Sequence, residues 1–321
     1  MAVAVYAPAS IGNVGVGFDV LGAALAPIDG TLLGDVVEVA AVSSVEEFTI
    51  TASGRFAHKL PADHKKNILF DCYLAVQKAL QAKGEPTPPI KMHLCKNLPI
   101  GSGLGSSASS IVAAIAALAQ FWGNKLSNDE QLRLMGELEG QISGSIHYDN
   151  VAPCFLGGIQ LMTERDDILC CSLPVIEDWY WCSAYPGITV STAEARAILP
   201  ANYSKAEIIK HGRLIANFIH ALHAQNSELA AAMIEDVIAE PYRKALLPNF
   251  DQTRQAMLDL GAKAVGISGS GPSIFAVCDS LEVAQNCNDY LAKNYLQNDD
   301  GFNHICKIDL KGVANVAAEN C

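Results

Sequence analysis

The sequence has few basic residues: 22 lysines and arginines stand against 34 aspartates and glutamates, a formal net charge of -12 over 321 residues. A chain with this excess of negative charge repels the phosphate backbone, so we expect no nucleic-acid partner. The sequence also lacks a run of about 18 uninterrupted apolar residues, so we expect no membrane-spanning helix. Any anion that binds here must be held by a local arrangement of groups rather than by overall charge.

Two further absences bear on the compartment. The first ten residues, MAVAVYAPAS, lack the basic region and the long apolar region of a signal peptide. The ten cysteines form no C-x-x-C pair, and no histidine cluster with zinc spacing accompanies them. We therefore expect reduced thiols, most of them buried, in a cytoplasmic protein.

Strand and helix patterns occupy separate stretches of the chain. Runs that are rich in β-branched residues or that alternate in polarity predict strands at 34–42, 47–54, 90–99 and 181–190, with two more inside 264–278. Alanine-rich or capped periodic stretches predict helices at 108–122, 127–140, 191–199, 206–225 and 227–240. This segregation favours an α+β fold over a doubly wound parallel sheet. An acidic, irregular stretch around 163–180 predicts a boundary between a first domain, 1–165, and a second, 166–321.

The predicted helix at 127–140 carries an acidic residue on its apolar face. It begins with a capping box formed by Ser127 and Glu130. At about 100° per residue, one face collects Leu132, Met135, Leu138 and Ile142. Glu139 falls on that same face, whereas Glu137 points the opposite way. Because an inward-facing carboxylate needs a cation or a hydrogen-bond donor, Glu139 is a candidate functional residue.

A glycine- and serine-rich loop joins the strand at 90–99 to the helix at 108–122. Its sequence, LPIGSGLGSSASS at 98–110, contains no lysine or arginine. The lysine-bearing phosphate loop, G-x-x-x-x-G-K-S/T, is therefore excluded. A dinucleotide fingerprint fits 103–108 only in its relaxed form, and the acidic residue expected about 20 positions later is missing.

A third interpretation of this loop needs no cationic side chain. Unpaired N–H groups at a helix N-terminus converge on one point, and the helix dipole adds positive charge there. The glycines let the backbone close around phosphate oxygens, while Ser106 and Ser107 offer hydroxyls to phosphate or to magnesium. A tight turn with no ligand is the alternative.

Three ordered motifs resemble those of the GHMP kinases, named for galactokinase, homoserine kinase, mevalonate kinase and phosphomevalonate kinase. They are VYAPASIGNVGVGFDVLG at 5–22, PIGSGLGSSAS at 99–109 and GISGSGPSIFAV at 266–277. Two more segments, GSIHYDNVAPCFLGG at 144–158 and STAEARAILP at 191–200, resemble the homoserine kinases of this family most closely. The resemblance implies a fold with an N-terminal ribosomal-protein-S5-like domain and a C-terminal ferredoxin-like α/β sandwich. It also implies ATP, Mg²⁺, the substrate L-homoserine and a homodimer.

The resemblance further implies a nucleotide site in this sequence. Its residues are Asn67, Pro99, Ile100, Gly101, Ser102, Gly103, Leu104, Gly105, Ser106 and Ser107. Asn67 corresponds to an asparagine near the adenine, although an asparagine that caps the following helix is an equal alternative. Ser107 and Glu139 would hold Mg²⁺, which prefers oxygen ligands. A buried glutamate paired with an arginine is the alternative for Glu139.

The same resemblance implies a substrate site of Asn13, Asp19, His147, Asn150, Thr192, Arg196, Arg243 and Gly269. Asp19 suits an α-ammonium group, and the guanidinium forks of Arg196 and Arg243 suit a carboxylate. Asn150 and Arg196 are the expected catalytic residues, with Asn150 orienting the acceptor hydroxyl. No lysine lies near GNVGVGFD, so we expect no strong general base. The alternative for Asn13 and Asp19 is a glycine-rich turn without a ligand, and the alternative for His147 is a structural histidine. Arg243 could instead form a surface ion pair, and Gly269 could belong to an ordinary hairpin.

The reaction implied is ATP + L-homoserine giving ADP + O-phospho-L-homoserine, a step toward threonine. A kinase for another alcohol, such as mevalonate, is the alternative within the fold. A metabolite-binding protein without catalysis is the alternative from another class, and the presence of Ser107 and Glu139 argues against it.

Overall fold

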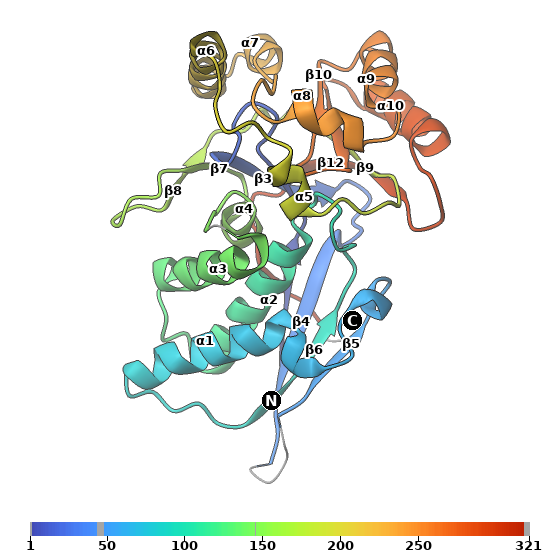
Figure 1. Cartoon of the computed structure of the whole chain (residues 1–321). Coiled ribbons are helices and arrows are strands. Elements are labelled where there is room, and N and C mark those ends of the chain that lie inside the picture. The colour runs from blue at the N-terminus through green and yellow to red at the C-terminus, as the bar shows by residue number, and fades with distance from the viewer. Residues whose placement is uncertain (1, 44–47, 145, 318–321) are drawn as a thin grey trace.

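The computed structural model describes residues 2–43, 48–144 and 146–317 of the chain. In these ranges the chain forms two β-sheets, one in each half of the molecule, and helices pack on each of them (Figure 1). The predicted α+β class is confirmed. None of the helices in the described ranges is long and apolar enough to cross a membrane.

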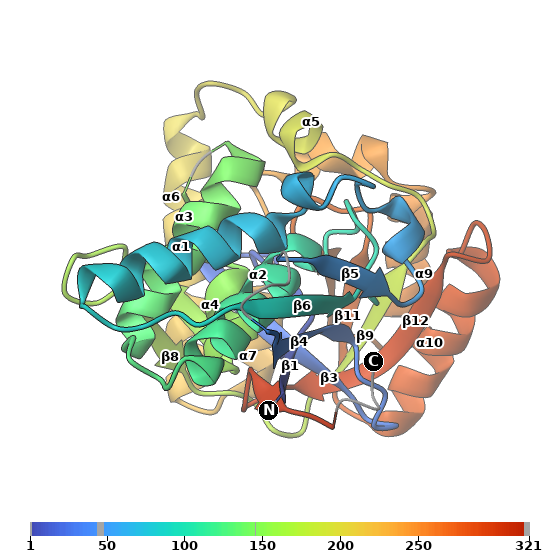
Figure 2. The same ribbon diagram turned by 90° about the horizontal axis from the view of Figure 1, so that it is seen from below.

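The first sheet comes mainly from the N-terminal part of the chain. Its strands are β1 (Ala2–Pro8), β4 (Gly34–Ala41), β5 (Ile50–Ser53), β6 (Ile90–Cys95) and β13 (Ala314–Asn315). They lie in the order β13-β1-β4-β6-β5, and only β5 and β6 pair in parallel. Figure 2 shows β5, β6, β4 and β1 side by side. The helices that pack with this sheet are α1 (Ile68–Ala82), α2 (Ser106–Phe121), α3 (Asn128–Ser143) and α4 (Val151–Leu156).

Helix α2 is the centre of this half. It contacts β1 and β4 on one side and α1, α3 and α4 on the others. Most of its residues are fully buried, because alanine and serine side chains are small enough to let the neighbouring elements approach closely. This tight packing fixes the position of the helix N-terminus, which follows the glycine-rich loop.

The second sheet combines strands from both ends of the chain. They are β2 (Ser10–Gly12), β3 (Leu21–Pro27), β7 (Ile159–Met162), β8 (Cys170–Leu173), β9 (Tyr180–Tyr185), β10 (Ala264–Ile267), β11 (Ile274–Cys278) and β12 (Phe302–Ile308). Their order is β10-β11-β9-β12-β3-β7-β8, with β2 paired to β3. The accompanying helices are α5 (Thr192–Ala197), α6 (Lys205–His223), α7 (Ser227–Ala232), α8 (Glu240–Arg243), α9 (Phe250–Asp259) and α10 (Leu281–Asn294).

The alternation along β11 shows that helices cover both faces of this sheet. Phe275 and Val277 join a core with residues of α6 and α7. Ile274 and Ala276 point to the other face and join a core with residues of α9 and α10. Successive side chains of a strand point to opposite faces, so the two helix pairs lie on opposite sides.

Three predicted elements were too long. The strand expected at 90–99 ends at Cys95. The helix expected at 227–240 ends at Ala232. The Asp236 carboxylate accepts the backbone N–H groups of Ile238, Ala239 and Glu240, which replaces helical hydrogen bonds with a turn that leads into α8. The strand expected at 181–190 ends at Tyr185, immediately before a proline and a glycine. The strand expected at 47–54 is observed as β5, over Ile50–Ser53. Residue 47, the first of the expected range, lies outside the described residues.

The sheets do not divide the chain at one position. β3 of the first 165 residues pairs with β12, and β1 pairs with β13 near the C-terminus. The division into domains 1–165 and 166–321 therefore stays a prediction, and strand pairing crosses it three times, because β7 also pairs with β8.

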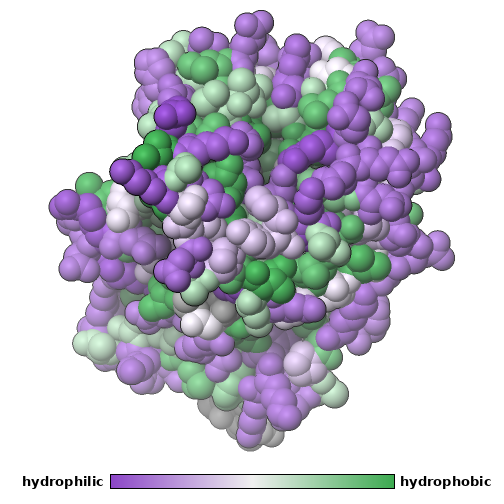
Figure 3. All heavy atoms as spheres, turned by 45° about the horizontal axis from the view of Figure 1, so that its top comes forward, coloured by the Kyte–Doolittle hydropathy of each residue, from purple (hydrophilic) through white to green (hydrophobic). Residues whose placement is uncertain are grey.

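The cysteines mostly match the expectation. Eight of them are free thiols in the part of the chain that the structure describes, and six of these are buried. Cys95 is bonded in a disulfide, so the expectation of reduced thiols is wrong at that position. Figure 3 shows a face on which hydrophilic side chains predominate and hydrophobic ones form separate groups.

Candidate active site

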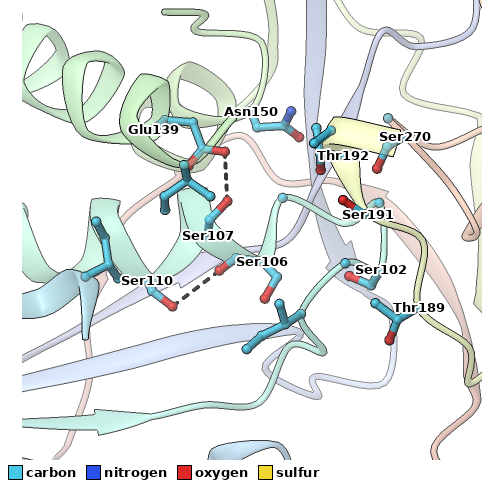
Figure 4. Close-up of a pocket in the computed structure, with 18 of the residues that line it drawn as sticks. Ser102, Ser106, Ser107, Ser110, Glu139, Asn150, Thr189, Ser191, Thr192 and Ser270 are labelled. Carbon is cyan, nitrogen blue, oxygen red and sulfur yellow. Dashed lines mark hydrogen bonds between the residues drawn. The ribbon is translucent and has the colours of Figure 1, made fainter. Parts of the chain in front are cut away.

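A cavity of about 450 Å³ lies where the glycine-rich loop, α3 and α5 meet. It gathers most of the predicted site residues, namely Asn13, Asp19, Asn67, Ile100, Gly101, Ser102, Gly103, Gly105, Ser106, Ser107, Glu139, His147, Asn150, Thr192, Arg196, Arg243 and Gly269. Figure 4 shows hydroxyl groups of the loop facing Glu139 of α3 and the start of α5. Two residues of the predicted nucleotide set, Pro99 and Leu104, do not line the cavity. Leu104 instead packs in the core of the second sheet and anchors the loop there.

The loop reaches its shape through three glycines with left-handed backbone. Gly101, Gly103 and Gly105 have φ of 66°, 77° and 63°, a region that other residues seldom adopt. Gly105 is the N-cap of α2, and no side chain caps the helix there. The N-terminal amides of α2 are therefore left for another acceptor, and the helix dipole makes an anion the preferred one.

The turn of the third motif lies directly against this loop. Ser268 Oγ donates to the Gly103 carbonyl oxygen at 2.6 Å, and the Ser273 amide donates to the Ser102 carbonyl oxygen at 3.1 Å. A Cβ atom added to Gly103 would lie 2.4 Å from the Ser268 carbonyl oxygen. Because these contacts join the two sheets, the loop and the turn form one wall of the cavity.

The first two serines of α2 have different partners. Ser106 Oγ donates to the Leu98 carbonyl oxygen at 3.1 Å, so this hydroxyl closes the loop on itself. Ser107 Oγ donates to Glu139 Oε1 at 2.7 Å (Figure 4). The periodicity argument placed Glu139 inward, and its side chain is indeed buried. Burial raises the pKa of Glu139, and the Ser107 hydroxyl opposes part of that rise.

The two charged groups expected to hold the two ends of an amino acid hold each other in this structure. Arg196 donates from both terminal nitrogens to the Asp19 carboxylate, at 2.9 and 2.8 Å. Asp19 sits in a glycine-rich turn at φ 56°, where its amide donates to Asn13 Oδ1 at 3.0 Å. Asn13 Nδ2 in turn donates to the Gly269 carbonyl oxygen at 3.3 Å. The fork geometry that suits a substrate carboxylate is thus already engaged by an acidic side chain.

Arg243 lies next to this pair and is 3% exposed. Its Nε donates to the Ala195 carbonyl oxygen at 3.0 Å, and Nη1 donates to the Gly269 carbonyl oxygen at 2.9 Å. Burial and, after it, the nearby charge of Arg196 lower the pKa of Arg243. The ring of Phe18 lies 5.2 Å from its guanidinium carbon and 5.8 Å from that of Arg196. A buried arginine against carbonyl groups contradicts the alternative of a surface ion pair.

His147, Asp149 and Asn150 form a hydrogen-bonded group that also lines the cavity. His147 Nδ1 lies 2.9 Å from Asp149 Oδ1, and Asn150 Nδ2 donates to Asp149 Oδ2 at 3.2 Å. Asn150 Oδ1 accepts from Ser10 Oγ at 2.8 Å, which fixes the orientation of the amide. Burial alone would lower the pKa of His147, but the hydrogen bond and charge of Asp149 outweigh it and raise the pKa.

Asn67 and Thr192 of the predicted site line the cavity, as does Ile142, which was not predicted there. Asn67 caps α1, since its Oδ1 accepts the Leu69 amide at 3.1 Å, as the capping alternative expected, and its place near the adenine stays a prediction. Thr192 is the first residue of α5. Ile142 was expected in the core with its helix face, but it is 51% exposed and lines the cavity instead. The apolar face of α3 therefore continues from the core into the site.

The sequence analysis missed a buried ion pair beneath the loop. Lys96 and Asp35 form this pair, and the Ser110 hydroxyl is hydrogen-bonded to both of them. Lys96 also lines the cavity. The signal was an acidic residue inside the apolar strand GDVVEV and a lone lysine directly after the strand at 90–95. Only the pairing of these strands in register brings the two charges together.

Comparisons with known proteins show the family and the fold. The profile of the GHMP kinases N terminal domain matches residues 67–158, and that of the GHMP kinases C terminal domain matches residues 218–297. A homoserine kinase from Cytophaga hutchinsonii is 34% identical, with a TM-score of 0.87 and coverage of 98% of this chain and 97% of that one. A putative homoserine kinase from Listeria monocytogenes is 21% identical, with a TM-score of 0.70 over 99% and 100% of the two chains.

A more distant structure shares the fold alone. The mevalonate kinase of Methanococcus jannaschii is 17% identical, with a TM-score of 0.67 over 96% of this chain and 98% of that one. The fold is that of a family of small-molecule kinases that use ATP. The chain belongs to this family, the GHMP kinases, which the three motifs at 5–22, 99–109 and 266–277 predicted.

Proposed function

We propose that this protein transfers the γ-phosphoryl group of ATP to the hydroxyl of L-homoserine, which yields ADP and O-phospho-L-homoserine in threonine biosynthesis. The observation that carries the proposal is the charge arrangement at one end of the cavity. Asp19, Arg196 and Arg243 lie together there, next to the N-terminus of α2. An amino-acid zwitterion needs one anionic and one cationic partner, and these side chains supply both. The 34% identity to a homoserine kinase supports the same acceptor.

The phosphate groups would lie against the glycine-rich loop. The uncapped amides of α2 and the helix dipole favour charge on the transferring phosphoryl group, without any cationic side chain in the loop. Asn67 and the apolar residues Leu60, Pro61 and Ile68 also line the cavity, and the adenine would lie against them. This placement points the terminal phosphate toward the charged end.

Ser107 and Glu139 fit a magnesium ion by their chemistry. A hydroxyl and a carboxylate oxygen lie 2.7 Å apart next to the uncapped helix, and hard oxygen donors are the ligands that Mg²⁺ prefers. The metal supplies charge neutralisation to the phosphates when it is bound. Glu139 keeps its carboxylate in place through the Ser107 hydroxyl, and Ser107 is in turn fixed by the first turn of α2.

Binding of the acceptor requires the Asp19–Arg196 pair to exchange partners. The substrate carboxylate would take the guanidinium forks of Arg196 and Arg243, and the ammonium group would take Asp19. An acceptor with only one charge breaks the pair and leaves the other charge without a partner, which costs binding free energy. We infer that this exchange makes the site selective for zwitterions.

The chain's own residues position the reacting groups rather than provide a strong base. Asn150 is held by Ser10 and Asp149, so its amide is oriented toward the acceptor hydroxyl before substrate arrives. Lys96 lines the cavity, but its ammonium group is already bonded to Asp35, Ser106 and Ser110. Positioning and charge stabilisation account for most catalysis of phosphoryl transfer.

An ADP-release assay with Mg-ATP tests the acceptor. The panel contains L-homoserine, homoserinol (which lacks the carboxylate), N-acetyl-L-homoserine (which lacks the ammonium), mevalonate and galactose. We expect turnover with L-homoserine, and values of kcat/KM lower by about 100-fold or more for both singly charged analogues. The Arg196→Ala variant should lose this turnover. Efficient turnover of mevalonate or of either analogue would contradict the zwitterion site while leaving the kinase assignment intact.

The expected homodimer and the cytoplasmic location also stay proposals. Light scattering coupled to size-exclusion chromatography measures the first, and fractionation of the source cells measures the second.

A further inference from the structure

A buried ion pair beneath the glycine-rich loop has no part in the reaction described above. Lys96 Nζ donates to Asp35 Oδ2 at 2.5 Å, to the Ser106 carbonyl oxygen at 2.9 Å and to Ser110 Oγ at 2.9 Å. Lys96 is 2% exposed and Asp35 is 0% exposed. An ammonium group has three N–H donors, so this geometry uses all of them.

Asp35 connects the same lysine to the other end of the loop. Its Oδ1 accepts the amides of Asn97 at 2.8 Å and Leu98 at 3.0 Å, where the chain leaves β6. Its Oδ2 accepts from Ser110 Oγ at 2.6 Å as well as from Lys96. Ser110 Oγ also lies 3.3 Å from the Ser106 carbonyl oxygen (Figure 4). One satisfied network therefore ties residues 97–98, before the loop, to residues 106–110, after it.

The energetics favour a geometric role over a purely stabilising one. Removing two charges from water costs free energy. A pair of apolar residues of similar volume often makes a fold as stable as a buried ion pair does, or more stable. The charge of Lys96 is balanced by Asp35, so the pair adds no net attraction for phosphates. A loop with left-handed backbone at Gly101, Gly103 and Gly105, in contrast, needs its ends fixed if its amides are to converge on one point.

We propose that Lys96 is a positioning residue for the nucleotide: through Asp35 and the Ser106 carbonyl it fixes the two ends of the glycine-rich loop relative to each other, so that the amides at the start of α2 are arranged before the phosphates bind. This inference rests on the proposed function, because it takes the loop as the phosphate site. It does not depend on which acceptor receives the phosphoryl group.

Two variants separate positioning from stability. Lys96→Met keeps the length of the side chain but leaves the Asp35 carboxylate buried without its cation. Adding Asp35→Asn removes that unpaired charge, while the amide oxygen can still accept from Asn97 and Leu98. The 2.9 Å hydrogen bond from Lys96 to the Ser106 carbonyl oxygen is absent in both variants, and only the longer contact of 3.3 Å from Ser110 Oγ to that carbonyl remains. We expect the double variant to recover thermal stability but not nucleotide affinity.

Calorimetric titration with Mg-ADP measures the affinity, and thermal unfolding measures the stability. Both variants should bind ADP about tenfold more weakly or worse. In the ADP-release assay, KM for ATP should rise while KM for the acceptor stays within about twofold. Leu80→Ala, in the buried α1 core, is the control for lost stability alone, and it should bind ADP like the wild type at a temperature where both are folded.

Three results would overturn the proposal. One is wild-type ADP affinity in Lys96→Met, and another is recovery of affinity together with stability in the double variant. The third is an equal loss of affinity in Leu80→Ala at matched stability. If Lys96→Met does not fold, the double variant decides alone. If the wild-type protein fails to bind ADP, the proposed function itself is contradicted and this inference falls with it; ADP binding without turnover contradicts only the acceptor.

Discussion

At the scale of single residues, Glu139 illustrates a conflict between stability and function. Its carboxylate is buried on the inner face of α3, and that burial raises its pKa. Because the pKa is raised in the folded protein, ionisation of Glu139 above the ordinary glutamate pKa favours the unfolded state over the folded one. A carboxylate whose burial lowers the stability of the fold, and which lies next to an uncapped helix, is a candidate for a functional role rather than a stabilising one.

The Glu139→Gln variant should separate the two effects. We expect its melting temperature at neutral pH to exceed that of the wild type by a few degrees, because a neutral amide replaces a buried charge. This gain should vanish as the pH falls below about 4.5, where the carboxyl is protonated in both states. Activity with Mg-ATP should drop by about 100-fold or more. A variant that is less stable at neutral pH yet fully active would contradict the assigned role.

For His147 we predict that the stability of the fold depends on pH with the opposite sign. The pKa of His147 is raised above 6.5, since Asp149 outweighs burial. A raised folded-state pKa stabilises the fold below the unfolded value and loses that effect as the pH rises through the folded value. The difference in unfolding free energy between wild type and His147→Gln should thus shrink from pH 6 toward pH 9. Denaturant titrations at each pH measure it, and Asp149→Asn should flatten the trend. A difference that grows with pH would refute the assignment.

At the scale of elements, two glycines inside helices should respond in opposite directions to the same substitution. Gly212 lies exposed in α6, and an added Cβ would meet nothing within 4 Å. Gly136 lies in α3, and an added Cβ would lie 2.2 Å from Tyr148 Cε1. Gly212→Ala should therefore stabilise the protein by about 0.5–1 kcal/mol, whereas Gly136→Ala should destabilise it by about 1–3 kcal/mol. Thermal unfolding of both variants tests the pair, and the same sign for both would show that the α3–Tyr148 packing is wrong.

The glycine-rich loop allows a matched test of its contact with the third motif. Gly103 and Gly30 have similar positive φ, 77° and 82°, but an added Cβ at Gly30 would meet nothing within 4 Å. Gly30→Ala should cost only the backbone strain, about 1 kcal/mol, and leave ADP binding unchanged. Gly103→Ala should cost more and weaken ADP binding by about tenfold or more, because the Cβ collides with the Ser268 carbonyl group. Equal effects of the two substitutions on ADP affinity would mean that the wall formed by the loop and Ser268 does not shape the site.

Local patterns predicted part of the fold, because the forces behind those elements are local, but they did not predict β1, β3, β12, α1, α9 or α10. The capping box at Ser127 and Glu130 starts α3 as expected, and the small residues of α2 give a buried helix. The helix expected over 227–240 failed because Asp236 offers the backbone a competing set of hydrogen bonds, which no periodicity reveals. Lys96 and Asp35 were missed for a related reason, since only strand register places them together.

At the scale of the whole molecule, the site depends on segments that are far apart in the sequence. The motifs at 5–22, 99–109 and 266–277 predicted the family, and the cavity brings residues of all three together. The sequence could not show that Asp19 and Arg196 pair with each other, because that contact joins residues 177 positions apart. Nor could it show that strands cross the expected domain boundary. In the proposed function, this acidic protein binds anions through uncapped amides and a few converging cations, which overall charge does not reveal.

One measurement tests the central claim most directly: ³¹P NMR of the protein with Mg-ATP and L-homoserine, followed over time. The account predicts a new phosphomonoester resonance, matching authentic O-phospho-L-homoserine, that grows at the same rate as ADP and requires both the amino acid and Arg196. Loss of ATP to free phosphate alone, or intact ATP in a sample where binding has been demonstrated, would contradict the transfer to a homoserine hydroxyl.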